Sequence, residues 1–141
     1  MKEVTVVRRV GRMFTEQGFE IRREVAVGPK RIDLAALNPY SGEVTAVEAK
    51  VEDWHAGLKQ AMIYRICANR VYLAVEERFA NRIDFGALRP YGIGAIAVDG
   101  GAQMILKARP STIVHPSLLQ EVRGSFSSAA TLEGGRRVGC S

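Results

Sequence analysis

The sequence predicts an α/β protein in which helices flank a central mixed β-sheet. Three observations support this class. A chain of 141 residues suits one domain and can bury roughly two-thirds of its unfolded surface. Its 47% hydrophobic and 25% charged residues are typical of an ordinary globular protein. Its segments follow the order helix, three strands, helix, strand, and the last three of these form a crossover unit.

Residues 3–17 are predicted to form the first helix. Apolar side chains recur there at the three- and four-residue spacing of one helix face, and they are Val6, Val7, Val10, Met13 and Phe14. Gly18 follows as a helix stop. We therefore expect this helix to pack on the sheet through one face.

Residues 19–27 alternate as a first strand. Four apolar residues would share one face, and they are Phe19, Ile21, Val25 and Val27. Arg23 interrupts that face, so we expect the strand to lie at an edge of the sheet or to begin to leave the core. Gly28 and Pro29 mark the turn that follows.

The next two predicted strands carry polar residues inside apolar runs. Asp33 lies within the run 32–37, and the run 44–51 contains Glu48 and Lys50. Side chains two residues apart in a strand point to the same face, so Glu48 and Lys50 would project together. The break between the runs is short enough for an antiparallel hairpin. Such a hairpin would place Asp33 beside Glu48.

The second half of the chain completes the sheet. Asp53 is a suitable N-cap for a helix over residues 54–68, and residues 71–75 form an apolar strand covered on both faces. We then expect a helix over 79–88, strands over 93–98 and 104–108, and a short helix over 117–122. Residues 1–123 would form one domain. Residues 124–141 are rich in Gly, Ser and Ala and would be a flexible tail, or one anchored by a partner subunit.

Two carboxylates and a lysine in apolar strands are costly to bury unless they pair or bind a metal ion. Neighbouring carboxylates repel each other, and a divalent cation relieves that repulsion. Oxygen ligands of this kind suit Mg²⁺ or Mn²⁺. Asp33 and Lys50 taken alone could instead be a buried ion pair with a structural role.

The spacing D-(x14)-E-x-K from Asp33 to Lys50 resembles that of the PD-(D/E)xK nuclease superfamily, which has the restriction-endonuclease-like fold. Ile32 stands where that family has its proline. Gln60 and Tyr64 lie four residues apart on the next helix, as in the RecB-type, Holliday-junction-resolvase-like branch. The resemblance covers about residues 19–75 and implies a core of the order α-β-β-β-α-β.

The resemblance also implies a role for each residue. Asp33, Glu48 and the backbone carbonyl of Ala49 would hold Mg²⁺ or Mn²⁺, which would activate a water molecule. Lys50 would position or help to deprotonate that water, Gln60 would orient it or a phosphate, and Tyr64 would pack beneath the site. Many relatives add a carboxylate from the first helix. In this chain no residue there is an obvious candidate, because Glu3 stands at its very start.

The chain is basic, with a net charge of +5 and a pI of about 9.6, which favours a polyanionic partner. Five residues near the predicted site are candidates to bind nucleic acid, and they are Arg8, Arg12, Lys30, Arg31 and Lys59. For the arginines of the first helix, an ordinary solvated face is the simpler interpretation.

Two classes of function follow. The first is a Mg²⁺-dependent endodeoxyribonuclease in DNA repair, recombination, restriction or defence. The second is a module of the same fold that has lost catalysis and binds nucleic acid or a partner protein. We expect DNA as the partner, and a homodimer or a separate recognition subunit to supply any specificity. No apolar run is long enough to span a bilayer, so we expect a cytoplasmic protein.

Overall fold

A computed structural model of the chain describes residues 1–126. Helix α1 (Glu3–Glu16) comes first, followed by strands β1 (Glu20–Val27), β2 (Lys30–Leu37) and β3 (Val44–Ala49). Helix α2 (Trp54–Tyr64) leads to β4 (Arg70–Glu76). The short helices α3 (Glu77–Ala80), α4 (Phe85–Leu88) and η1 (Arg89–Tyr91) follow, and then β5 (Gly94–Val98), β6 (Ala102–Leu106) and α5 (Pro116–Arg123).

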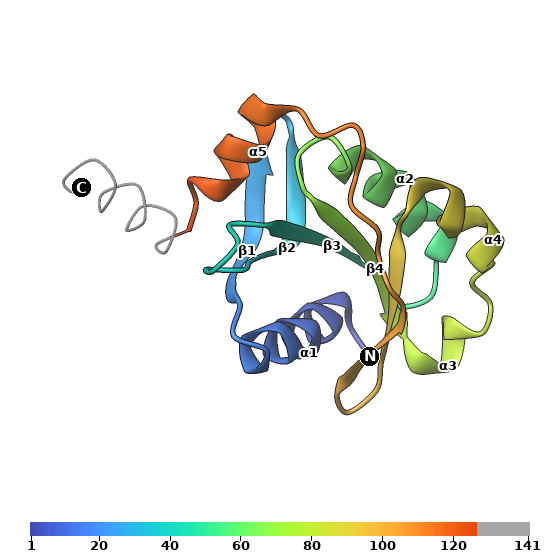
Figure 1. Cartoon of the computed structure of the whole chain (residues 1–141). Coiled ribbons are helices and arrows are strands. Elements are labelled where there is room, and N and C mark those ends of the chain that lie inside the picture. Colours follow the sequence, from blue (N-terminus) through green and yellow to red (C-terminus); the bar gives the residue numbers. More distant parts are fainter. Residues whose placement is uncertain (127–141) are drawn as a thin grey trace.

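The six strands form one mixed sheet in chain order, β1-β2-β3-β4-β5-β6 (Figure 1). The pairs β1/β2 and β2/β3 are antiparallel, β3/β4 and β4/β5 are parallel, and β5/β6 is antiparallel. The predicted α/β class and the order helix, three strands, helix, strand are confirmed. The arrangement is that of a restriction-endonuclease-like core.

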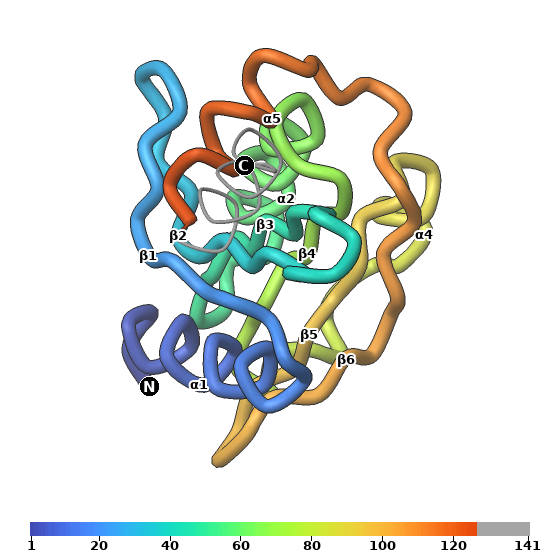
Figure 2. The backbone as a smooth tube through the Cα atoms, turned by 60° about the vertical axis from the view of Figure 1, so that its left-hand side comes forward, coloured from blue at the N-terminus to red at the C-terminus, as the bar shows by residue number. Residues whose placement is uncertain are grey.

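Helices cover both faces of the sheet (Figure 2). Val6, Val10 and Phe14 of α1 pack on one face against residues such as Leu34 and Tyr72. The helices α2, α4 and α5 pack on the other face. The carboxyl ends of the parallel strands β3 and β4 therefore lie at one edge between the two layers, where α/β sheets commonly bind ligands.

The first strand changes faces midway, and this corrects the predicted alternation. Phe19 and Ile21 pack on the side of α1, whereas Val25 and Val27 pack on the side of α2 and α5. The change occurs at Glu24, whose φ of 53° is left-handed and turns the following side chains over. Arg23 interrupts the apolar pattern next to this change of faces, and β1 lies at an edge of the sheet, as expected.

The predicted helix over 79–88 is two short helices, α3 and α4. The Asp84 carboxylate accepts a hydrogen bond from the Gly86 amide at 2.9 Å and so starts a new helix at Phe85. A helix cap within the predicted span therefore divides it. None of the helices among residues 1–126 is long and apolar enough to cross a membrane.

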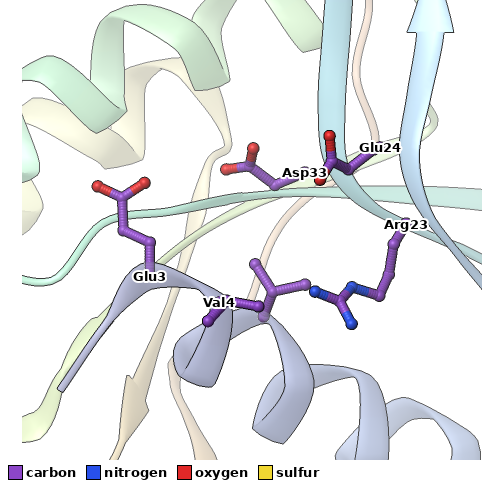
Figure 3. Close-up of a pocket in the computed structure, with 6 residues that line it drawn as sticks. Glu3, Val4, Arg23, Glu24 and Asp33 are labelled. Carbon is purple, nitrogen blue, oxygen red and sulfur yellow. The ribbon is translucent and has the colours of Figure 1, made fainter.

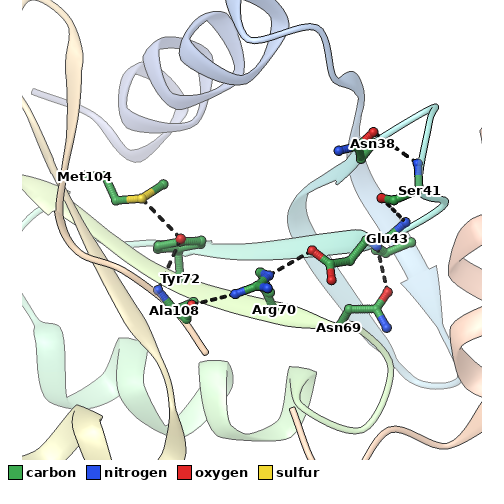
Figure 4. Close-up of polar contacts among 9 residues, drawn as sticks. Asn38, Ser41, Glu43, Asn69, Arg70, Tyr72, Met104 and Ala108 are labelled. Carbon is green, nitrogen blue, oxygen red and sulfur yellow. Dashed lines mark hydrogen bonds and ion pairs between the residues drawn. The ribbon is translucent and has the colours of Figure 1, made fainter. Parts of the chain in front are cut away.

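Polar contacts hold the amino ends of the parallel strands (Figure 4). The Arg70 side chain donates hydrogen bonds to Glu43 Oε1 and to the carbonyl oxygen of Ala108, both at 2.8 Å. The Ala108 amide donates to the hydroxyl of Tyr72 at 3.2 Å. These bonds fix the segment after β6 against the start of β4.

The described chain ends in contact with the core. Phe126 is 1% exposed and belongs to the cluster beneath α5. The rest of the tail predicted over residues 124–141, from residue 127 onward, lies outside the described residues.

Candidate active site

Asp33 and Glu48 lie side by side at the carboxyl end of β3. The antiparallel register pairs Leu34 with Val47, so the next residues along, Asp33 and Glu48, face each other across the two strands. The Ala49 amide donates a hydrogen bond to Asp33 Oδ2 at 2.8 Å. The structure therefore brings together the two carboxylates that the hairpin predicts.

Glu48 is a buried carboxyl group with an altered acidity. It is 5% exposed, and burial raises its pKa to about 7. The hydrogen bond from Tyr64 and the charge of Lys50 act in the opposite direction, whereas the charge and hydrogen bonding of Asp33 raise the pKa further. A cation that bound here near neutral pH would therefore displace a proton from Glu48.

Tyr64 supports Glu48 from below. Its hydroxyl donates to Glu48 Oε1 at 2.6 Å and lies 3.0 Å from the carbonyl oxygen of Arg31. Burial and the neighbouring carboxylate raise the pKa of Tyr64, so the hydroxyl stays a donor. Tyr64 thus both packs in the core and orients one oxygen of Glu48.

Lys50 brings a positive charge to the carboxylates. Its Nζ lies 3.8 Å from Glu48 Oε2. Helix α2 approaches this residue closely at Gly57, where a Cβ atom would lie 3.1 Å from Lys50 Cγ and 2.4 Å from Leu73 Cδ1. Since no side chain fits there, Gly57 allows α2 to lie directly against Lys50 and Leu73.

Gln60 lies on α2, one turn before Tyr64, and is half-buried. Its side chain makes no hydrogen bond within residues 1–126. The structure thus places Gln60 on the helix that carries Tyr64 without joining it to the carboxylates. Trp54, at the start of the same helix, is 9% exposed and stacks on His55 with ring centroids 3.8 Å apart.

A carboxylate from α1 also reaches this region. Glu3 and Asp33 line a pocket of about 150 Å³, together with Val4, Val7, Arg23 and Glu24 (Figure 3). Sequence reasoning missed Glu3, because a residue at the very start of a helix can point its side chain toward the sheet or away from it. The pocket that the start of α1 forms with Asp33 provides that direction. The feature of the sequence that could have indicated Glu3 is that it is the acidic residue in the first turn of the N-terminal helix.

The predicted nucleic-acid contacts lie on several surfaces. Arg8 and Arg12 are exposed one turn apart on α1, and Lys59 is exposed on α2, on the other face of the sheet. Lys30 is exposed at the first position of β2, and Arg31 pairs with Glu24 at 3.1 Å. The five residues therefore lie on different surfaces rather than forming one patch.

The donor set fits a hard divalent cation. Asp33 and Glu48 offer carboxylate oxygens, and Mg²⁺ in proteins often takes one or two carboxylates and keeps several water ligands. In the described part of the chain, no group of three or more His, Cys, Asp or Glu side chains is already arranged as a metal site. The pair thus fits an ion that retains water.

The comparisons place the chain in a family. Residues 1–136 match the family described as DNA repair protein MmcB-like. No curated protein matches significantly. A solved structure of a protein of unknown function from Silicibacter pomeroyi is similar in fold, with a TM-score of 0.72 and 21% identity over 97% of this chain and 92% of that chain. The chain thus belongs to the MmcB-like family of DNA repair proteins.

Proposed function

We propose that the protein is a Mg²⁺- or Mn²⁺-dependent endonuclease of the PD-(D/E)xK type that hydrolyses DNA phosphodiester bonds. One observation carries this proposal: Asp33 meets the buried Glu48 at the end of β3, with Lys50 3.8 Å from Glu48. The family's role in DNA repair supports DNA as the substrate.

Each residue of the site has a task in this proposal. Asp33, Glu48 and the carbonyl of Ala49 hold the ion, which when bound polarises the scissile phosphate and acidifies a water ligand. Lys50 is placed to orient that water or to stabilise charge on the phosphate. Tyr64 keeps Glu48 in place through its hydrogen bond at 2.6 Å.

Glu3 and Arg23 extend the site toward the substrate. Glu3 adds the carboxylate that many members of the superfamily carry on the first helix, and it shares a pocket with Asp33. Arg23 lines the same pocket, is exposed, and makes no ion pair within residues 1–126. Its guanidinium group suits a phosphate oxygen of the bound strand.

Cleavage assays test this function. Labelled single-stranded, duplex and branched DNA are incubated with Mg²⁺, Mn²⁺ or EDTA and the wild-type protein, Asp33→Asn, Lys50→Ala and the control Glu16→Gln. We expect metal-dependent cutting by wild type and Glu16→Gln, and a loss of at least about 100-fold in the other two variants. Cutting that persists in Asp33→Asn would exclude this site.

A second candidate is a DNA-binding module without catalysis. It is favoured by the state of Glu48, whose two oxygens already face the Tyr64 hydroxyl and the Lys50 ammonium. In that case the wild-type protein binds DNA equally well in EDTA and in Mn²⁺ and cuts none of the three substrates.

A further inference from the structure

A second pocket lies at the amino edge of the parallel strands. It has a volume of about 410 Å³ and is lined by Arg89, Gly92, Ile93, Leu106, Lys107 and Arg109. Gly92 has a φ of 70°, and the Arg109 amide donates to its carbonyl oxygen at 2.9 Å. The chain after β6 therefore packs on the turn after η1 and brings the three basic residues to one place.

The charge of this pocket is not neutralised. Arg89, Lys107 and Arg109 are exposed, and none of them pairs with a carboxylate within residues 1–126. No acidic residue lines the pocket. The Arg109 guanidinium donates to the carbonyl oxygen of Arg89, which holds it in place without cancelling its charge. Three cations held together in this way favour an anion between them.

An exposed aromatic ring adjoins the basic pocket. Tyr91 is 40% exposed and directly precedes Gly92. The guanidinium of Arg65 lies 5.3 Å from the centre of its ring, and Arg65 Nε is buried without a hydrogen-bond partner in the described chain. An exposed ring interleaved with unpaired cations is typical of surfaces that bind single-stranded nucleic acid, where the bases stack and the phosphates pair.

This surface is separate from the carboxylate site. Strand β5 begins beside it at Gly94, and the antiparallel β6 ends beside it at Leu106, whereas Glu48 lies on β3, which β4 separates from β5. Glu48 pairs with Leu73 of β4, which in turn pairs with Ala95 of β5, so β5 begins two strand spacings, or roughly 10 Å, across the sheet from β3. Figure 2 shows the orange segment after β6 running alongside this end of the molecule.

We propose that Arg65, Arg89, Tyr91, Lys107 and Arg109, here termed the Arg89 surface, bind single-stranded nucleic acid. The backbone phosphates pair with Arg89, Lys107 and Arg109, and a base stacks on Tyr91. Nucleic acid is favoured over an acidic protein because the ring lies among the cations and because the family acts in DNA repair. The protein then holds one segment of DNA here while another reaches the carboxylates.

Binding without catalysis tests the proposal. Fluorescence anisotropy follows labelled single-stranded and duplex DNA in EDTA at several salt concentrations. Replacing Arg89, Lys107 and Arg109 together by Ala should weaken single-strand binding at least about tenfold and reduce the salt slope by about 2. The control pair Arg78→Ala/Arg82→Ala removes two other exposed arginines, which both lie over Phe79, and should change the affinity less than about twofold. An unchanged slope in the triple variant would overturn the proposal.

Three further variants separate the surface from folding and from general charge attraction. Lys107→Ala removes a side chain that makes no hydrogen bond within residues 1–126, and it should lower the slope by about 0.7 for one lost contact with a single strand. Tyr91→Ala should weaken single-strand binding at least about fivefold, while Tyr91→Phe retains it. Equal losses for single strands and duplex in Tyr91→Ala would exclude the stacking role. Because EDTA excludes cleavage, these results stand even if the protein cuts no DNA.

Discussion

Glu24 and Asp33 lie opposite each other on β1 and β2, and the regular pairing of the two strands is interrupted between them. Arg23 pairs with Leu34 and Val25 with Ile32, but the residues between do not pair. Glu24 is left-handed there, with a φ of 53°. Both strands change faces at this point, since Leu34 packs on the side of α1 and Ile32 on the side of α2. The pairing of β1 with β2 is thus interrupted at Asp33, the residue that lies beside Glu48.

Substitutions at Glu24 should reveal this backbone strain. Glu24→Gly removes the steric cost of the left-handed conformation and should change the free energy of unfolding by less than about 1 kcal/mol. Glu24→Val should destabilise the protein by about 1–2 kcal/mol or more, because a β-branched residue does not favour this conformation. Urea unfolding measures both effects. Ala26→Val, at an exposed position without a positive φ on the same strand, is the control. Equal stability of the Gly and Val variants at position 24 would contradict the account.

Glu48 should make the metal-free protein less stable as the pH rises. Its pKa is raised from 4.5 to about 7 by burial, so its contribution to stability is complete below pH 4.5 and is lost as the pH passes 7. The loss is on the order of 3 kcal/mol. Urea unfolding in EDTA between pH 5 and 8 measures it. Glu48→Gln, which cannot titrate, should lack this component, and parallel pH profiles for the two proteins would disprove the assignment.

Tyr64→Phe should raise the pKa of Glu48 further. The hydroxyl stabilises the charged carboxylate through a hydrogen bond at 2.6 Å, so its loss favours the protonated form. Carbon-13 NMR titration of the carboxyl group follows this shift, and the free energy of unfolding should also fall by about 1–3 kcal/mol. Tyr72→Phe is the matched control, because its hydroxyl accepts a hydrogen bond from the Ala108 amide on the other face of the sheet. A pKa of Glu48 that moves equally in both variants would refute this role of Tyr64.

Glu3→Gln should weaken metal-dependent cleavage without unfolding the protein. Glu3 is exposed in the first turn of α1, so its loss should alter stability by only about 0.3–1 kcal/mol through the helix dipole. Its carboxylate shares the pocket of Asp33, and cleavage should fall at least about tenfold. Glu16→Gln, at the other end of the same helix, should retain full cleavage. Equal activity of the two variants would remove Glu3 from the site.

Much of the fold follows from local patterns. The short break between the second and third strands sets their register, and that register alone brings Asp33 beside Glu48. The crossover from β3 through α2 to β4 follows from the alternation of strand and helix periods. Asp53 caps α2 as predicted, accepting a hydrogen bond from the Ala56 amide at 3.1 Å.

Other features depend on contacts that a single sequence does not reveal. A left-handed glutamate has no local signal, and only the misplaced Arg23 indicated an irregular strand. The direction of Glu3 depends on how α1 crosses the sheet. The Arg89 surface is formed by η1, the end of α2 and the chain after β6, which are far apart in sequence. The composition therefore indicated that the protein is basic but not where its basic residues gather.

Isothermal titration of the metal-free protein with Mn²⁺ tests the central claim most directly. The account predicts saturable binding by the wild type and by the control Glu16→Gln, stronger at pH 8 than at pH 6 because the proton on Glu48 must leave. Asp33→Asn and Glu48→Gln should each weaken that binding at least about tenfold. If wild type takes up no Mn²⁺, or if the two variants bind it as tightly as wild type, Asp33 and Glu48 do not form a metal site.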